Sequence, residues 1–184
     1  MRKFYFSIIL SFSFFVVVAQ QLPDMSTFAL NPQILSPVYC GEYDFSNLNL
    51  HYRNQWTGIE GAPETTILTF DTPVKPEKIG LGIVLLQDNS NIIQQQNILG
   101  NYSYLANING DHFIRFGLGF GVIKNALDFD KIRAQNMDEQ SILNNVHSKT
   151  SIDANLGLNY QFKNLRIGLF AQHLVNSKLS FENH

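Results

Sequence analysis

The sequence has few charged residues, one cysteine and no strong excess of either charge. Charged residues make up 15% of its 184 residues, whereas a typical soluble domain has about 25%. The formal net charge is −2, so no basic excess points to nucleic-acid binding. The lone Cys40 excludes an internal disulfide, and we expect it to be a small buried residue. The length suits one domain, and the shortage of charge indicates surfaces that do not all face water.

No apolar run is long enough for a membrane-spanning helix, which needs about 20 apolar residues. The longest run, residues 4–18, follows two basic residues at the N-terminus. Val17 and Ala19 fit the small-residue positions of a signal-peptidase cleavage site. We therefore predict a signal peptide over residues 1–19 and export from the cytoplasm, with a short membrane anchor as the alternative.

The rest of the chain lacks a helical period and shows a period of two residues. Apolar residues alternate with Gly, Asn, Gln, Ser or Arg; for example, Phe116 and Leu118 alternate with Gly117 and Gly119. Each such stretch predicts a strand with one apolar and one polar face. The predicted strands are 47–53, 66–72, 79–87, 97–105, 112–123, 152–162 and 165–171.

Two all-β folds share this pattern. In a soluble sandwich the apolar faces pack together, whereas in an outer-membrane barrel they face lipid and the polar faces line the lumen. The polar faces are rich in Gly and amides and poor in Lys and Glu, which favours a lumen. Long connections at 54–65 and 124–150 alternate with short ones, as in outer-membrane barrels. We therefore predict an antiparallel outer-membrane β-barrel, with a secreted β-sandwich binding module as the alternative.

Motifs for catalysis, metals and cofactors are missing. The five histidines lack metal-ligand spacing, and the acidic residues within 124–150 lack the order of an EF-hand loop. Gly117, Gly119 and Gly121 lack the spacing and the context of a nucleotide-binding loop. The local sequence suggests no nucleophile–base pair. We therefore predict a protein that is not an enzyme and that needs no metal or cofactor.

Two motifs carry a resemblance to a known family. The first is FALNPQILSPVYCGEYD, residues 28–44, and the second is YRNQWTGIEGAPETTILTFDTPV, residues 52–74. Further matching stretches follow in the expected order at 78–88, 101–104 and 165–174. With these stretches the chain resembles the PorP/SprF family of the type IX secretion system, found in Bacteroidetes.

The resemblance implies candidate interaction residues in both motifs. Three positions of the first motif, Ser36, Val38 and Cys40, depart from the family pattern. Trp56, the only tryptophan, follows the first predicted strand, and we expect it at the outer mouth of the barrel or at the level of the lipid headgroups. The candidates are Asn31, Pro32, Pro37, Tyr39, Gly41, Tyr52, Arg53, Gln55, Trp56, Gly58, Gly61, Ala62 and Pro63.

The resemblance also implies a function in protein secretion. Such proteins are outer-membrane barrels that work with type IX machinery proteins, assist export or surface attachment of cargo proteins and, in gliding species, serve adhesin export. The implied partners are that machinery, the cargo and outer-membrane lipid. We expect residues 20–42 to form an N-terminal periplasmic segment and residues 43–184 to form the barrel strands and loops. A passive outer-membrane channel is a further alternative.

Family members are longer than this chain, which stops soon after its seventh predicted strand. Single-chain bacterial barrels have an even number of strands. We therefore expect an incomplete, N-terminal portion of a barrel, truncated relative to the family, whose first and seventh strands each have an unpaired edge.

Overall fold

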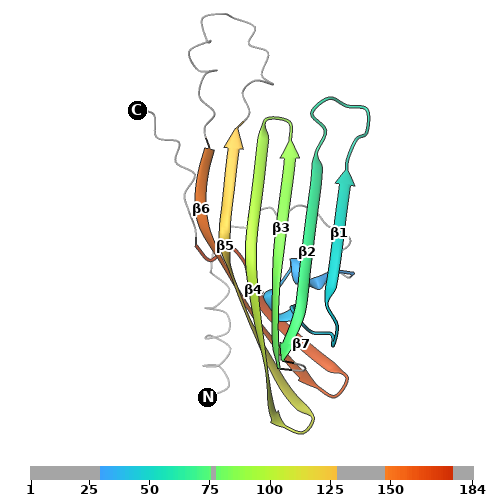
Figure 1. Ribbon diagram of the computed structural model, residues 1–184, viewed down its shortest axis with the longest axis vertical. Coiled ribbons are helices and arrows are strands. Elements are labelled where there is room, and N and C mark those ends of the chain that lie inside the picture. Colours follow the sequence, from blue (N-terminus) through green and yellow to red (C-terminus); the bar gives the residue numbers. More distant parts are fainter. Residues whose placement is uncertain (1–29, 76–77, 128–147, 176–184) are drawn as a thin grey trace, which may run out of the picture.

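The computed structural model describes residues 30–75, 78–127 and 148–175. Seven strands form one antiparallel sheet, in which each strand pairs with the next along the chain (Figure 1). They are β1 (Asn47–Asn54), β2 (Glu64–Lys75), β3 (Ile79–Ser90), β4 (Ile93–Asn109), β5 (His112–Leu127), β6 (Ser148–Phe162) and β7 (Leu165–Ala171). All seven predicted strands are confirmed. The predicted signal peptide lies outside the described residues.

Several strands are longer than the alternation predicted. Strand β4 has 17 residues and β5 has 16. The extra residues at the start of β4 are mostly glutamines, whose polarity hides the alternation, but the backbone pairing continues through Gln96 and Lys124 to Ile93 and Leu127. Strand ends are therefore set by backbone hydrogen bonding between neighbours, which local hydropathy does not report.

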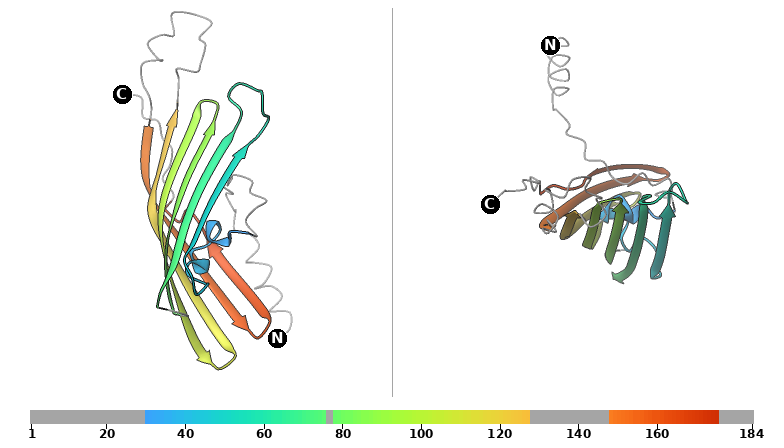
Figure 2. Two further views of the ribbon diagram at one scale, coloured as in Figure 1. Left: turned by 45° about the vertical axis from the view of Figure 1, so that its right-hand side comes forward. Right: turned by 90° about the horizontal axis from the view of Figure 1, so that it is seen from above.

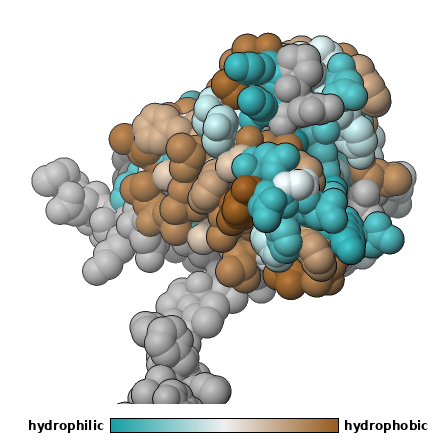
Figure 3. All heavy atoms as spheres, turned by 90° about the horizontal axis from the view of Figure 1, so that it is seen from below, coloured by the Kyte–Doolittle hydropathy of each residue, from teal (hydrophilic) through white to brown (hydrophobic). Residues whose placement is uncertain are grey.

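The sheet curls into half of a barrel with one convex and one concave face (Figure 2). The convex face exposes the apolar residues, such as Leu118 and Phe120 on β5. The concave face carries the small and polar residues, including Gly117 and Gly119. Figure 3 shows the same division from the end of the sheet, with hydrophilic residues toward the middle and hydrophobic residues along part of the margin. The fold prediction is therefore confirmed as a seven-stranded antiparallel half-barrel, the form expected for part of an outer-membrane barrel.

The half-barrel has two open edges. Within the described ranges, β1 and β7 each pair with a strand on one side only. An open strand edge presents unpaired N–H and C=O groups, which are costly in lipid. Within the part of the chain that the structure describes, no helix has the length and apolar character to cross a membrane.

Residues 30–46 cross the concave face and contain two short 3-10 helices, η3 (Pro32–Ile34) and η4 (Pro37–Tyr39). Each begins with proline, whose fixed φ suits the first helical position. The periplasmic location expected for residues 20–42 stays a prediction. The structure places the described part of this segment against the strands, inside the curve of the sheet (Figure 2). This position is explained by a patch of apolar residues on the concave face, which the segment shields from water. The patch consists of Ile67, Val84 and Leu99, and Ile34 of the segment and Leu86 of β3 pack against it.

Candidate functional site

The concave face has room for the backbone of residues 30–42 because glycines lie beneath it. A Cβ atom at Gly80 would overlap the carbonyl group of Cys40. A Cβ atom at Gly117 would overlap the backbone of Val38. These glycines, part of the polar face of the predicted strands, therefore allow the close approach of a second piece of backbone, which side chains would prevent.

Hydrogen bonds hold both ends of this segment on β2. Near its start, the Asn31 amide donates to the Thr69 hydroxyl at 2.6 Å and lies 3.3 Å from the Nε2 atom of His51. Near its end, the Gly41 N–H donates to the Asp71 carboxylate at 2.8 Å. Asn31, Thr69, Gly41 and Asp71 are all buried. Water does not reach these groups, so the hydrogen bonds between them satisfy their polar atoms.

Residues from other parts of the sheet complete the contacts of the segment. The Ser103 hydroxyl on β4 donates to the carbonyl of Cys40. The Gln172 amide, which follows β7, donates to the carbonyls of Ile34 and Leu35 at 3.2 and 2.8 Å. The segment is therefore bonded to strands near both edges of the half-barrel, and it ties them together across the concave face.

Cys40 is fully buried at the centre of these contacts, as the sequence predicted. Burial, with a smaller contribution from the charge of Asp71, raises the pKa of the Cys40 thiol to about 12. A thiol reacts as its thiolate. Cys40 is therefore protonated and unreactive while the segment lies on the sheet.

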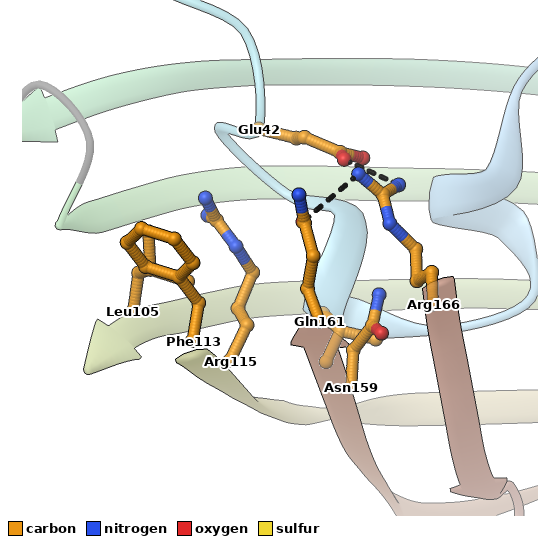
Figure 4. Close-up of a pocket in the computed structure, with 8 residues that line it drawn as sticks. Glu42, Leu105, Phe113, Arg115, Asn159, Gln161 and Arg166 are labelled. Atoms are coloured by element: carbon orange, nitrogen blue, oxygen red, sulfur yellow. Dashed lines mark hydrogen bonds and ion pairs between the residues drawn. The ribbon is translucent and has the colours of Figure 1, made fainter. Parts of the chain in front are cut away.

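A cleft of about 220 Å³ remains beside the segment, at the end of the sheet that carries the β4–β5 and β6–β7 turns (Figure 4). Arg166 spans its mouth: its guanidinium pairs with the Glu42 carboxylate at 2.6 Å and donates to the Gln161 amide oxygen at 3.3 Å. The cleft is lined by Val38, Glu42, Leu105, Phe113, Arg115, Asn159, Gln161 and Arg166.

Arg115 lies at the base of this cleft and is only 9% exposed. Its Nη1 atom donates to the Gly41 carbonyl at 3.5 Å and to the Ser103 hydroxyl at 3.3 Å. Among the residues that the structure describes, no carboxylate lies within 4.0 Å of the Arg115 guanidinium. The sheet therefore buries a positive charge whose only direct partners are neutral.

The second motif forms the loop 55–63 between β1 and β2, at the opposite end of the sheet. The Gln55 N–H donates to the Pro63 carbonyl at 3.0 Å and closes the loop. The Asn91 N–H of the β3–β4 turn donates to the Gly61 carbonyl at 3.0 Å, which joins the two connections. Gly61 has a φ of +78°, a conformation that favours glycine. The loop therefore has a defined shape, held by a backbone hydrogen bond across its base and by another to the β3–β4 turn.

Trp56 lies in this loop and is 69% exposed, with a φ of +54°. Tyr52 at the end of β1 also exposes most of its ring. With the Gln55 amide oriented so that its oxygen faces Arg53, the Arg53 Nε donates to it at 2.8 Å. The exposed aromatic rings and the Arg53–Gln55 pair give this end of the sheet a surface that its own contacts leave free for a partner.

The structure separates the candidate residues into two places. Those of the first motif lie on the concave face and those of the second at the β1–β2 loop. The first set is Asn31, Pro32, Pro37, Tyr39 and Gly41; the second is Tyr52, Arg53, Gln55, Trp56, Gly58, Gly61, Ala62 and Pro63. Sequence analysis missed the residues that hold the first set, namely Thr69, Asp71, Ser103 and Gln172. In the sequence, all four of these residues are recognisable only as polar residues in or beside a predicted strand. That pattern does not show which residue of the segment each one binds.

The described residues contain no group of three or more His, Cys, Asp or Glu side chains that could hold a metal ion. The acidic residues between 128 and 147 lie outside the described part. The arrangement offers binding surfaces built from amides, guanidinium groups and aromatic rings.

Comparison with known proteins agrees with the two motifs. The chain matches the family model described as type IX secretion system membrane protein PorP/SprF over residues 17–184. No curated protein and no solved structure gives a significant match. The matched range contains both motifs and every described strand. The resemblance seen in the sequence is therefore confirmed, and the chain belongs to the PorP/SprF family of type IX secretion system membrane proteins.

Proposed function

We propose that this protein is an outer-membrane component of type IX secretion that assists export or surface attachment of cargo proteins, including adhesins in gliding species. Family membership supports the secretion role. The main support for an outer-membrane location is the apolar surface of the convex face. Rows of exposed apolar side chains run across all seven strands there, while the concave face is mostly polar apart from the buried patch of Ile67, Val84 and Leu99. Such a division suits strands with lipid on one side and a lumen on the other.

The lengths of the connections support an orientation. The short turns after β2, β4 and β6 lie at one end of the sheet, and the loop 55–63 and the residues 128–147 follow strands that end at the other (Figure 1). Outer-membrane barrels have short periplasmic turns and longer outer loops. In this orientation Trp56 faces the cell surface and the cleft beside Arg115 opens toward the periplasm.

The exposed loop supports binding of cargo at the outer end. Trp56 and Ile59 both expose most of their side chains there, and aromatic residues supply much of the energy of protein interfaces. Machinery proteins of the periplasm would contact the opposite end. Residues 30–42 cover the concave face, which supports a binding role over a passive channel.

Deletion of the gene tests the function. We expect particular type IX cargo proteins to remain in the periplasm of the deletion strain, while the abundance of unrelated outer-membrane proteins is unchanged. The wild-type gene should restore secretion. Normal secretion and surface attachment of all type IX cargo in the deletion strain would show that the protein has another role.

The membrane location has its own test. Leu118 lies mid-strand on the convex face, where an arginine facing lipid costs about 2–4 kcal/mol. Leu118→Arg should therefore lower the amount of folded protein in the outer-membrane fraction. Leu165→Arg, at the first residue of β7, is the control, since the cost near the interface falls to about 0–1 kcal/mol. Release of the wild-type protein by a carbonate wash would instead indicate a soluble or peripheral protein.

A further inference from the structure

The buried charge of Arg115 is not explained by the contacts of the fold. A guanidinium stays protonated in proteins, and Arg115 is 9% exposed. Its contacts with the Gly41 carbonyl and the Ser103 hydroxyl are long, at 3.5 and 3.3 Å, and both involve Nη1. The Glu42 carboxylate favours the charge of Arg115 from beyond bonding distance, but burying a charge without a directly bonded counter-charge is unfavourable. Arg115 lines the cleft, so an anion bound there lies next to its side chain.

The nearby carboxylates are engaged elsewhere. Glu42, the acidic residue that lines the cleft, pairs with Arg166 at 2.6 Å. Asp71 accepts the N–H of Gly41 at 2.8 Å. The cleft therefore contains two guanidinium groups and one carboxylate, and the charge left without a direct partner is that of Arg115.

A second group in the cleft also lacks a partner. Asn159 is buried, and its Oδ1 atom has no hydrogen-bond partner among the described residues. Leu105 and Phe113 lie on the other side of Arg115 (Figure 4). The cleft thus combines a positive charge, a free hydrogen-bond acceptor and an apolar wall within about 220 Å³.

We propose that this cleft binds a carboxylate carried by an apolar residue, as at the C-terminus of a peptide. Arg115 pairs with the carboxylate, the chemistry for which a guanidinium is best suited. The N–H of the terminal residue donates to Asn159 Oδ1, and the apolar side chain contacts Leu105 and Phe113. The volume is below the roughly 300–1,000 Å³ of pockets that hold a whole ligand, so the cleft admits one terminal residue. This inference does not depend on the export of cargo.

Other anions satisfy only part of the cleft. Inorganic phosphate could pair with Arg115, but its oxygens would lie against the apolar side chains of Leu105 and Phe113. Acetate carries the carboxylate but has neither the N–H for Asn159 nor an apolar side chain. The three features together select a terminal amino acid that is acylated on its nitrogen.

The test is titration calorimetry on the full-length protein in detergent at pH 7, with N-acetyl-leucine as the probe. N-acetyl-leucinamide is the matched control, since a neutral amide of similar size replaces the carboxylate and the rest of the molecule is the same. We expect N-acetyl-leucine to bind at least about tenfold more tightly than its amide, because a charged hydrogen-bonded pair contributes more than a neutral one. No binding of the acid, equal binding of the amide, or equally strong binding of phosphate would each overturn the proposal.

Variants locate the site. Arg115→Gln should lower the affinity for N-acetyl-leucine at least about tenfold, and Arg115→Lys should retain part of it. Lys124→Gln, which removes a charge from the exposed end of the same strand β5, should leave the affinity unchanged. An unchanged affinity in Arg115→Gln would overturn the proposal. If Arg115→Gln does not fold, the comparison of acid and amide on the wild-type protein decides.

Discussion

Residues 31–41 and residues 52–63 carry the two motifs of the family, yet they lie in opposite environments. Asn31 and Gly41 are buried on the concave face, and each is bonded to a side chain of β2. Trp56, by contrast, is largely exposed at the end of the sheet. Two motifs of one family therefore have different physical roles: the first packs against the sheet, and the second presents an exposed surface.

The hydrogen bonds explain the difference. The segment 31–41 directs polar groups to side chains of distant strands, so its conformation depends on the sheet. The loop 55–63 closes on itself through Gln55 and Pro63, so its conformation needs few contacts outside it. The side chains of the loop are consequently free for another molecule.

Chemical labelling should show the largest difference between the two motifs. Burial raises the pKa of Cys40 to about 12, whereas an exposed thiol has a pKa of about 8.5. At pH 7.5 a maleimide should therefore label Cys40 about a thousandfold more slowly than the thiol introduced by Trp56→Cys in a Cys40→Ser background.

The pH dependence sharpens this labelling experiment. Because the raised pKa keeps the Cys40 thiol protonated, its rate should still be rising above pH ~8.5, where the rate at position 56 levels off. Denaturation should remove the difference. Equal rates in the folded protein would mean that residues 31–41 leave the concave face.

Filling the space beneath the first motif should have the largest effect on stability. The methyl group of Gly80→Ala would overlap the backbone of Cys40 and should lower the free energy of unfolding by about 3 kcal/mol. Gly100→Ala, on the convex face with only an ordinary contact, is the control and should change it by less than about 0.5 kcal/mol. Urea titration followed by gel mobility measures both, and similar stabilities would contradict the close packing.

Removing one buried hydrogen bond should have a moderate effect. Asn31→Ala deletes the bond to Thr69 and leaves a buried hydroxyl without that partner, which should cost about 1–2 kcal/mol. Asn54→Ala deletes an exposed bond of 3.1 Å to Glu64 and should cost less than about 0.5 kcal/mol. The same urea titration compares the two variants. A larger loss of unfolding free energy in Asn54→Ala than in Asn31→Ala would contradict the conclusion that the first motif is the one that stabilises the fold.

The smallest effect on stability is expected at the second motif. Trp56→Ala should change the free energy of unfolding by no more than about 0.5 kcal/mol, because the side chain is 69% exposed. It should nevertheless lower the export or surface retention of cargo, measured in culture supernatants and on cells. Leu50→Ala, an exposed apolar residue on the convex face of β1, should leave export unchanged. Loss of the Trp56→Ala protein from the membrane would make Trp56 a structural residue.

Much of the fold could be predicted from the sequence because the signal is local. The alternation at Phe116, Gly117 and Leu118 follows from the pleat of a strand, which places neighbours on opposite faces. The polar start of β4 could not be predicted, since Gln96 lies in a strand because it pairs with Gln87 of β3 and Lys124 of β5. For the second motif, the position of Trp56 beside the first strand was predicted, because it follows directly from that strand and its loop.

The strands, their apolar and polar faces and membership of the family follow from the sequence alone, because each depends on residues close together in the chain. The position of residues 30–42 and the set of side chains that share the cleft are known only from the folded structure. The Gln172 amide bonds to Ile34 across 138 residues, and Arg115 comes within reach of Gly41 across 74. Such pairs form only when the curl of the sheet brings distant strands to one concave face, where buried polar groups must find partners among whatever the fold places beside them.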